Sequence, residues 1–433
     1  MLRLGKVATG GHAYYLEVAG GTGTGAEPPG RWLGSGGAVL GLTGEVEEAS
    51  LDALLRGRHP VDGRVLGTAH HRVRVAAFDL TFCAPKSVSV LHALGPGPVR
   101  ASVAEGHEAA VEAALQYAER HALGVRRRMG PGGPRVTEGA EGTAVAGFVH
   151  RTSRALDPHL HTHVVAANLG RGPDGVWRAL DGRGVYAHAG ATAAVYHAQL
   201  RYELTTRLGV AWGRLDRGRA DIAGIGPEAR REFSTRSAQI GAHLAARGLA
   251  PPGPGRGAPV QAAHLGLGRR AGPRATAIAA HRTRAAKDPA QQVDDLLEWW
   301  HRRAEGVGLG PRRLQAVLDR VPRRAPVSPD LDLLRDRVTR DLAAARPTAT
   351  RRDVVRASCA RLPAGAPLPW LEEAADHVVS SLEPLHPDHG PSRRRGPGVA
   401  EPRLRLEGHL GRERLGLERP GLERSADAGL GLG

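Results

Sequence analysis

The chain has 433 residues and a formal net charge of +16, and lysine supplies only three of its 60 basic residues, so arginine dominates. Two cysteines exclude a disulfide framework, and the lack of a signal peptide and of any apolar stretch of about 18 residues excludes membrane insertion, so we expect a cytoplasmic protein. An arginine excess of this size predicts a polyanionic partner, most simply nucleic acid.

A tyrosine pair stands near the start of the chain. Tyr14 and Tyr15 lie in a short amphipathic stretch within residues 1–20, and a glycine-rich loop follows. Taken alone, such a pair is more simply explained as core aromatics of a short helix. The acidic first turn of residues 43–55 then predicts a helix.

Residues 74–82 alternate in the manner of a β-strand and place Asp79 on the polar face. A helix is expected over 84–94, beginning close to a proline. Lys86 and Ser87 stand in its first turn, but the segment lacks the glycines of a P-loop. We therefore expect this turn to be a helix N-terminus that contacts DNA.

Three histidines carry the strongest chemical signal. His161 and His163 are two residues apart in a run rich in β-branched residues, so on a strand both face the same side. His150 ends the preceding apolar run, and antiparallel pairing through a short turn places it opposite the other two. Three imidazoles on one face are costly to bury without a partner, which favours a divalent metal. His159 shares the face but flanks the cluster at the strand entrance.

The ligand types favour a catalytic metal site over a structural one. Three neutral histidines leave coordination positions open for a substrate. Structural zinc, the main alternative, usually recruits cysteine, and Cys83 and Cys359 stand far apart and in no CxxC pair.

Helices and linkers account for most of the remaining chain. Further helices are expected at about 99–122, 186–209, 227–248 and 288–306. Trp212 begins a short strand, and the proline-, glycine- and arginine-rich residues 249–275 predict a loop that extends over DNA. Residues 327–382 form a small separate helical unit with a capping box at Thr350. Low-complexity sequence from 384 onward predicts disorder.

Five ordered features resemble the relaxase domain of the TrwC/TraI class, the MobF relaxases of conjugative plasmids, which belong to the HUH endonucleases. They are the tyrosine pair, the block from Phe78 to Ser89, the Phe148-Val-His150 run, the block from Ser153 through His163 to Asn168, and the helix with Tyr196 and Leu200-Arg-Tyr-Glu-Leu204 that ends before Trp212. Together they cover about residues 1–310.

The resemblance implies an α+β fold, with a central antiparallel β-sheet and flanking helices. It also implies that His150, His161 and His163 bind a divalent metal ion, which is Mg, Mn, Ni or Zn. The implied partner is single-stranded DNA at an origin of transfer. Accessory DNA-binding proteins, a coupling protein and a type IV secretion machinery are the further partners that it implies.

The same resemblance assigns roles in the chemistry. Tyr14, in preference to its neighbour Tyr15, attacks a phosphate to give a 5′-phosphotyrosine and a free 3′-OH, and the same site can rejoin the strand. Asp79 either orients a metal-bound histidine or accepts the tyrosine proton. The residues expected to bind DNA are Lys86, Ser87, Arg154 and Arg201.

Two departures from the family pattern bear on function. Many relatives carry a second tyrosine pair, and residues 21–25 contain none, so a second covalent transfer needs Tyr15 or another protein copy. Relatives also continue into a helicase, whereas no GxxxxGK[ST] motif occurs in this chain. We therefore expect no ATPase and no unwinding activity, and a relaxase-only form and a truncated gene both fit.

The expected domains are a relaxase over 1–310, a helical linker over 311–383 that resembles the start of a helicase region, and a disordered tail over 384–433. Two other functions remain open at this point. A rolling-circle replication initiator shares the His-x-His motif, although the block around Asp79 favours the relaxase. A catalytically inactive DNA-binding remnant is the alternative outside the enzymes.

Overall fold

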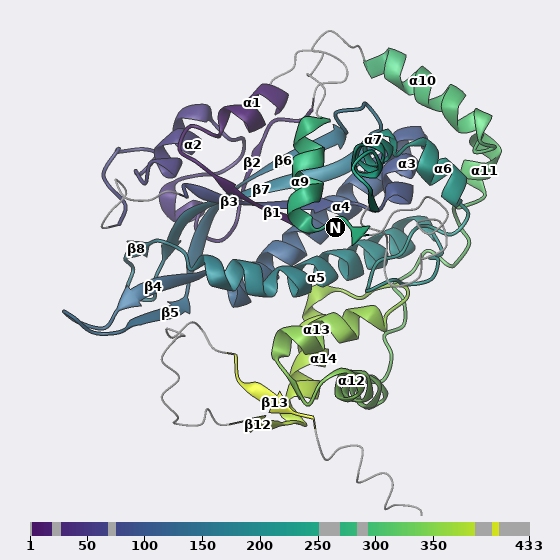
Figure 1. Cartoon of the computed structure of the whole chain (residues 1–433). Coiled ribbons are helices and arrows are strands. Elements are labelled where there is room, and N and C mark those ends of the chain that lie inside the picture. The colour runs from purple at the N-terminus through teal and green to yellow at the C-terminus, as the bar shows by residue number, and fades with distance from the viewer. Residues whose placement is uncertain are drawn as a thin grey trace, which may run out of the picture.

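The computed structural model describes residues 2–19, 27–67, 75–250, 269–283, 293–385 and 401–406. Its centre is a six-stranded antiparallel sheet with helices on both faces, which confirms the predicted α+β class (Figure 1). The strands follow the order β1 (Leu2–Val7), β3 (Ala77–Cys83), β7 (Pro158–Arg171), β6 (Gly142–Thr152) and β2 (Arg31–Leu33), and β8 (Trp177–Arg178) pairs with β7.

One face of the sheet packs against three helices. These helices are α3 (Lys86–Leu94), α4 (Gly97–His121) and α5 (Gly182–Leu208). Phe78, Leu80 and Phe82 of β3 project into this layer and join the main hydrophobic core, as the alternation of the strand predicts. Asp79 and Thr81 therefore project to the opposite face.

That opposite face is partly covered by α1 (Ala13–Ala19) and α2 (Glu48–Leu55), with the short 3-10 helix η1 (Ala38–Leu40) beside them. Tyr15 of α1 and Leu51 of α2 pack with Phe148 and Val165 of the sheet in a second cluster. The helix expected over 43–55 thus begins at Glu48. Next to this cluster lies the part of the sheet that carries the predicted site.

The helix expected over 227–248 is two helices, α6 (Pro227–Glu232) and α7 (Thr235–Ala245). The chain leaves the helical conformation because the fully buried Phe233 packs in the main core and the Thr235 backbone amide donates to the Asp157 carboxylate. The strand expected at Trp212 is reduced to one isolated bridge.

Past this point the described chain is interrupted. Most of the predicted 249–275 loop lies outside the described residues, and so does the start of the helix expected at 288–306. The elements here are β9 (Leu249–Ala250), β10 (Arg269–Arg270), α9 (Pro273–Arg282), α10 (Val293–Gly306) and α11 (Pro311–Gln315). A hairpin of β4 (Gly124–Arg128) and β5 (Arg135–Gly139) extends from the other end of the molecule (Figure 1).

The C-terminal helices are not separate from the rest. Their core includes α4 and α5, because Tyr117 and Val195 are buried together with Val354 and Leu371. The helices are α12 (Leu331–Ala345), α13 (Arg351–Ala360), which has the predicted Thr350 capping box, and α14 (Leu368–Ser380).

The disorder expected from residue 384 onward does not hold for all of it. Residues 401–406 include β13 (Arg403–Arg405), which pairs with both β11 (Thr348–Ala349) and β12 (Glu383–Leu385). The physical reason is that Leu404 and Leu406 are buried in the C-terminal core. The rest of the predicted tail lies outside the described residues.

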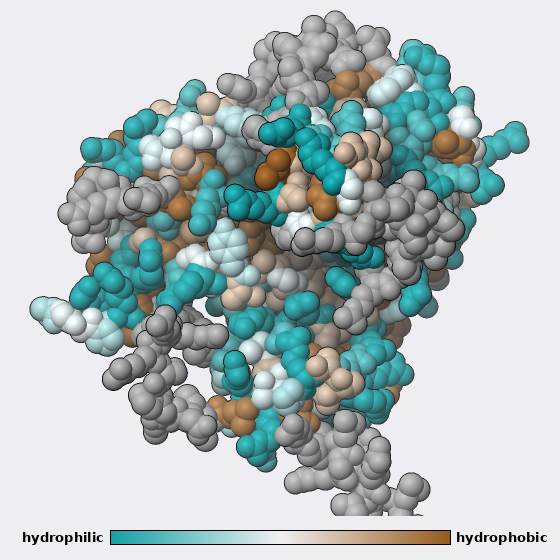
Figure 2. All heavy atoms as spheres, in the orientation of Figure 1, coloured by the Kyte–Doolittle hydropathy of each residue, from teal (hydrophilic) through white to brown (hydrophobic). Residues whose placement is uncertain are grey.

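Hydrophilic side chains gather over much of the visible surface, with smaller apolar patches among them (Figure 2). Among the residues that the structure describes, no helix combines the length and apolar character needed to cross a membrane.

Candidate active site

The three predicted histidines come together on the open face of the sheet. Strands β6 and β7 pair so that His150 lies directly opposite His161, and His163 follows two residues later on the same face. One ligand atom from each of the three residues lies within 4.8 Å of the other two. This spacing suits a single cation bound by three imidazoles.

In two of these histidines, one ring nitrogen makes a hydrogen bond within the protein, and the other is available to a ligand. His161 Nδ1 donates to the His159 carbonyl at 2.7 Å, and His163 lies with Nδ1 2.8 Å from Asp79 Oδ2. Both acceptors are oxygens, so we assign the proton to Nδ1 and the lone pair to Nε2 in each ring. Burial lowers the pKa of His161 to about 4, which keeps this imidazole neutral as a ligand must be.

Asp79 connects the histidine cluster to the tyrosine helix. Its Oδ2 accepts from Tyr15 at 3.0 Å as well as from His163, and its Oδ1 accepts from Thr81 at 3.1 Å. A carboxylate behind a ligating imidazole fixes the ring orientation and raises its basicity. Sequence reasoning did not identify Thr81 as part of the site, although the alternation of β3 places it on the face of Asp79.

The two tyrosines differ in environment. Tyr15 is only 6% exposed, and its ring stacks on Phe148 with 5.5 Å between centroids. Burial, followed by the negative charge of Asp79, raises the pKa of Tyr15 well above its usual value. This hydroxyl is therefore a poor nucleophile in the observed geometry.

Tyr14 is 36% exposed and faces the histidines. Its ring centroid lies 6.1 Å from that of His163, and the Arg154 guanidinium lies 5.5 Å from the Tyr14 ring centroid. A cation at this position can contact a phosphate that approaches the tyrosine. Of the two tyrosines, Tyr14 is the one accessible to a substrate.

The turn that carries Arg154 is held by distant helices, which sequence reasoning did not identify. Asp157, which is buried, accepts from Thr235 of α7 and forms an ion pair with Arg303 of α10. Trp300 Nε1 donates to the carbonyl of Leu156, whose φ is +59°. A positive φ in a branched residue is strained, so these contacts hold the turn in place.

Three of the residues expected to bind DNA have internal roles instead. Ser87 is fully buried, and its hydroxyl donates to Asp221 Oδ1 at 2.7 Å. Arg201 is 1% exposed and donates to three backbone carbonyls, those of Gly218, Cys359 and Leu362. These two expectations are wrong for this geometry because neither side chain reaches solvent.

Lys86 is likewise turned inward. Its Nζ donates to the Pro158 carbonyl at 2.6 Å, at the start of β7, and burial lowers its pKa to about 8. Its ammonium group thus supports the histidine strand from within the protein. Arg154 is the member of the expected DNA-binding set that lies at the tyrosine.

Behind β7, on the helix-covered face, lies a second polar network that the sequence did not reveal. His107 of α4 makes two hydrogen bonds of 2.8 Å, one between Nδ1 and the Tyr196 hydroxyl and one between Nε2 and the Thr162 hydroxyl. Thr162 stands between two of the clustered histidines, so this network anchors their strand to α4 and α5.

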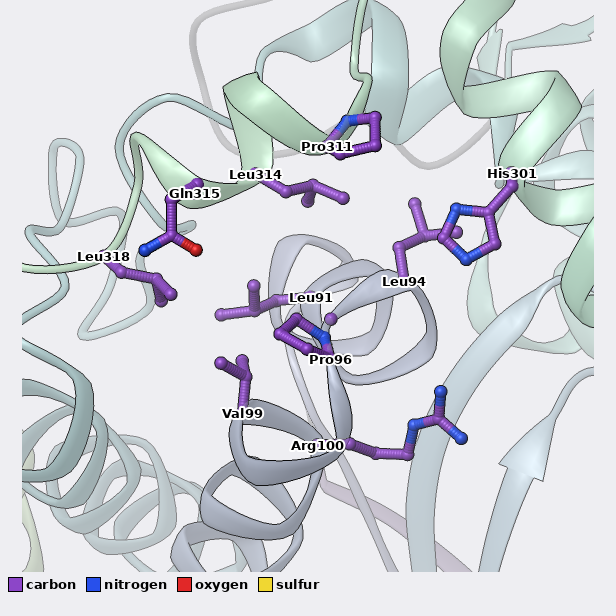
Figure 3. A pocket seen from close by; sticks show the side chains of 11 residues that line it. Leu91, Leu94, Pro96, Val99, Arg100, His301, Pro311, Leu314, Gln315 and Leu318 are labelled. Carbon is purple, nitrogen blue, oxygen red and sulfur yellow. The ribbon is translucent and has the colours of Figure 1, made fainter.

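A cavity of about 400 Å³ lies elsewhere, where the end of α3 and the start of α4 meet α10 and α11. Its walls are mainly apolar, including Leu91, Val99 and Leu318, with Arg100 and His301 at one side (Figure 3). None of the predicted site residues lines it, so it is separate from the histidine cluster.

Comparisons with known proteins agree with this geometry. Residues 4–307 match the family model described as TrwC relaxase. The chain is 37% identical over 191 residues to the multifunctional conjugation protein TraI of Escherichia coli, and 36% identical over 194 residues to TraI of Escherichia coli strain K12. These segments are 40% of this chain but only 10% of either relative, so the chain spans about a tenth of their length.

Solved structures are similar over a larger part of the chain. A metal-bound structure of the conjugative relaxase TrwC in complex with oriT DNA matches with a TM-score of 0.61 and 29% identity, over 71% of this chain and 99% of that one. TrwC with a 27-mer DNA comprising the recognition hairpin and the cleavage site matches with a TM-score of 0.59, 28% identity and the same coverage. The family model spans more than half of the sequence and includes the whole histidine and tyrosine arrangement. The chain belongs to the TrwC relaxase family.

Proposed function

We propose that this protein is a conjugative relaxase that nicks and rejoins one strand of origin-of-transfer DNA through a 5′-phosphotyrosine intermediate. The observation that carries the proposal is the exposed Tyr14 beside a cluster of three histidines whose rings the fold orients. The family model over residues 4–307 supports a relaxase rather than a rolling-circle initiator.

In this proposal Tyr14 is the nucleophile. Its oxygen forms a bond to the phosphorus of the scissile phosphate, and the bond between phosphorus and the 3′ oxygen breaks. The tyrosine loses a proton and the departing 3′ oxygen gains one, so the reaction is balanced. One phosphodiester replaces another, and for this reason a free 3′-OH can reverse the step at the same site.

The residues present fit a divalent metal. His150, His161 and His163 offer three ligand atoms within bonding reach of one cation, and His161 is neutral. When bound, such a cation withdraws charge from a non-bridging oxygen of the scissile phosphate. Imidazole ligands prefer Mn²⁺, Ni²⁺ or Zn²⁺ over Mg²⁺, so we expect each of these three ions to bind more tightly than Mg²⁺.

Asp79 and Tyr15 are positioning residues in this scheme. Asp79 orients His163 by accepting a hydrogen bond from its Nδ1. This contact favours the orienting role of Asp79 over the role of a base that accepts the proton of the nucleophile. Tyr15 donates to the same carboxylate and stacks on Phe148, so it fixes the helix that carries Tyr14. A second covalent transfer would need Tyr15 to leave this buried position, or another copy of the protein to supply its own tyrosine.

The proposed substrate is single-stranded DNA at an origin of transfer, since related TrwC chains are known in complex with oriT DNA. Arg154 is suited to bind a phosphate next to the nucleophile. Accessory DNA-binding proteins, a coupling protein and a type IV secretion machinery complete the proposed set of partners, with the relaxase itself acting in the cytoplasm.

The test is covalent trapping. Single-stranded oligonucleotides tiled across the DNA beside the gene are incubated with the protein and Mn²⁺, and denaturing gels reveal any protein–DNA adduct. We expect an adduct with one oligonucleotide, nicking of a supercoiled plasmid that carries that site, and weak cleavage of relaxed linear duplex. DNA binding without any adduct across the set would instead favour the inactive remnant.

A further inference from the structure

The edge strand β1 contributes a cation to the face of the sheet that carries the histidines. In the pairing of β1 with β3, Arg3 lies opposite Thr81 and Gly5 lies opposite Asp79. Directly opposed residues of antiparallel strands project to the same face. Thr81 is in turn opposite His163 on β7, so Arg3, Thr81 and His163 form one row across the sheet.

Arg3 is exposed, and no ion pair to its guanidinium exists among the described residues. Adjacent strands are about 4.8 Å apart, so β1 lies roughly 10 Å from β7, a span that a long arginine side chain can largely cover.

The strip between Arg3 and Asp79 carries no bulky side chain. Gly5 is the next residue of β1 on this face, and a Cβ there would lie 3.5 Å from Asp79 Cβ. A glycine at this point allows a ligand to approach the strand closely. Arg154 approaches the tyrosine from the turn between the inner strands β6 and β7, whereas Arg3 comes from the edge strand β1.

We propose that Arg3 binds a backbone phosphate of the DNA strand, next to the phosphate that Tyr14 attacks. The inference rests on the proposed function and extends it, because it identifies where the strand crosses the sheet. The DNA then runs from the β6–β7 turn across β7 and β3 to the edge at β1, with a guanidinium at each end. Arginine is suited to this contact because its planar fork meets two phosphate oxygens at once.

The same strand offers a matched control. Lys6 is also exposed and cationic, but it lies opposite Phe78 and therefore projects to the helix-covered face. Its ammonium group lies 6.0 Å from the ring centroid of Tyr186 on α5. Arg3→Gln and Lys6→Gln thus remove the same charge from the same strand, on opposite faces.

The experiment measures binding of the adduct-forming oligonucleotide by the full chain in the Tyr14→Phe background, over a series of salt concentrations. We expect Arg3→Gln to weaken binding about 5- to 10-fold at low salt, and to reduce the slope of log affinity against log salt by about 0.7, the value for one phosphate on a single strand. Lys6→Gln should change the affinity by no more than about 2-fold and should leave the slope unchanged. Arg3→Lys should restore most of the slope but less of the affinity.

Equal effects of Arg3→Gln and Lys6→Gln would overturn the inference, because Arg3 would then act only through net charge. Equal melting temperatures of the variants exclude a folding defect. If the Tyr14-containing chain forms no adduct with any oligonucleotide, the relaxase function fails. If it does form one and Arg3→Gln binds that DNA like the unaltered chain, only the Arg3 inference fails.

Discussion

On the open face of β7, which carries the histidine cluster, His161 and His163 each use one ring nitrogen in a hydrogen bond within the protein. On the closed face, which packs against the helices, His107 uses both ring nitrogens in hydrogen bonds, to Tyr196 and Thr162. Burial lowers the pKa on both faces, to about 4 for His161 and about 3 for His107. The shifts alone therefore do not separate a ligand from a structural residue.

The hydrogen bonds do separate them. A neutral imidazole has one donor and one acceptor nitrogen, so His107 has nothing left to offer a substrate or an ion. His161 and His163 each donate a hydrogen bond within the protein through Nδ1, and the acceptor nitrogen Nε2 remains for a ligand. The comparison predicts that substitutions on the open face change the chemistry, whereas substitutions on the closed face change stability.

The largest effect should come from the tyrosine that faces the open side. Tyr14→Phe deletes the attacking oxygen and little binding surface, so we expect adduct formation to fall by at least about 1000-fold while DNA affinity stays within about 2-fold. Tyr15→Phe should slow the reaction by about 10-fold or less. Gel trapping and filter binding measure both quantities, and full adduct formation by Tyr14→Phe would reverse the assignment.

The second largest effect should come from removal of a metal ligand on the open face. His161→Ala is expected to weaken Mn²⁺ or Ni²⁺ binding by about 100-fold or more, since one of three ligands is lost. Thr162→Val, one residue away but directed to the closed face, should leave metal affinity within about 3-fold. Isothermal calorimetry on both variants tests this contrast, and unchanged affinity in His161→Ala would contradict the proposed metal site.

The carboxylate behind His163 should have an intermediate effect. Asp79→Asn keeps the size of the side chain but removes the charge that orients the imidazole, and such changes typically cost 10- to 100-fold in metal affinity or activity. We expect a slower cleavage rate at saturating DNA, with the affinity for uncleaved DNA little changed. A loss confined to DNA affinity, at a normal cleavage rate, would reject the orienting role.

The smallest effect belongs to the closed face. Thr162→Val replaces a hydroxyl by a methyl and leaves His107 Nε2 buried without its partner, which should lower the free energy of unfolding by about 1–3 kcal/mol. Thr162→Ser keeps the hydroxyl and should cost less. Denaturant unfolding measures the difference, and equal stability of the two variants would show that the hydrogen bond contributes little.

Local periodicity was sufficient to predict the arrangement of the histidines. The two-residue spacing of His161 and His163, and the short turn back to His150, determine a shared face once β6 and β7 pair. This shared face depends on neighbours in the sequence, and for that reason it could be read from it. The α+β class was implied by the family resemblance.

Features that depend on distant contacts could not be predicted. The sequence predicts a DNA contact at Arg201, but the carbonyl partners of this side chain include Cys359 and Leu362, more than 150 residues away. The composition of the tail predicts disorder, yet Leu404 is buried and its strand pairs with β11 and β12. Which tyrosine is exposed likewise depends on how α1 packs against Phe148, a contact between remote segments.

The central claim is that the exposed tyrosine, and not its buried neighbour, attacks the DNA beside the histidine cluster. The most direct test is protease digestion of the trapped adduct followed by mass spectrometry of the nucleotide-bearing peptide, with fragmentation that separates Tyr14 from Tyr15. The structure predicts a 5′-phosphoryl nucleotide on Tyr14, because Tyr15 donates its hydroxyl to Asp79 in a buried position. A nucleotide found on Tyr15, or on any residue outside this pair, would contradict the account.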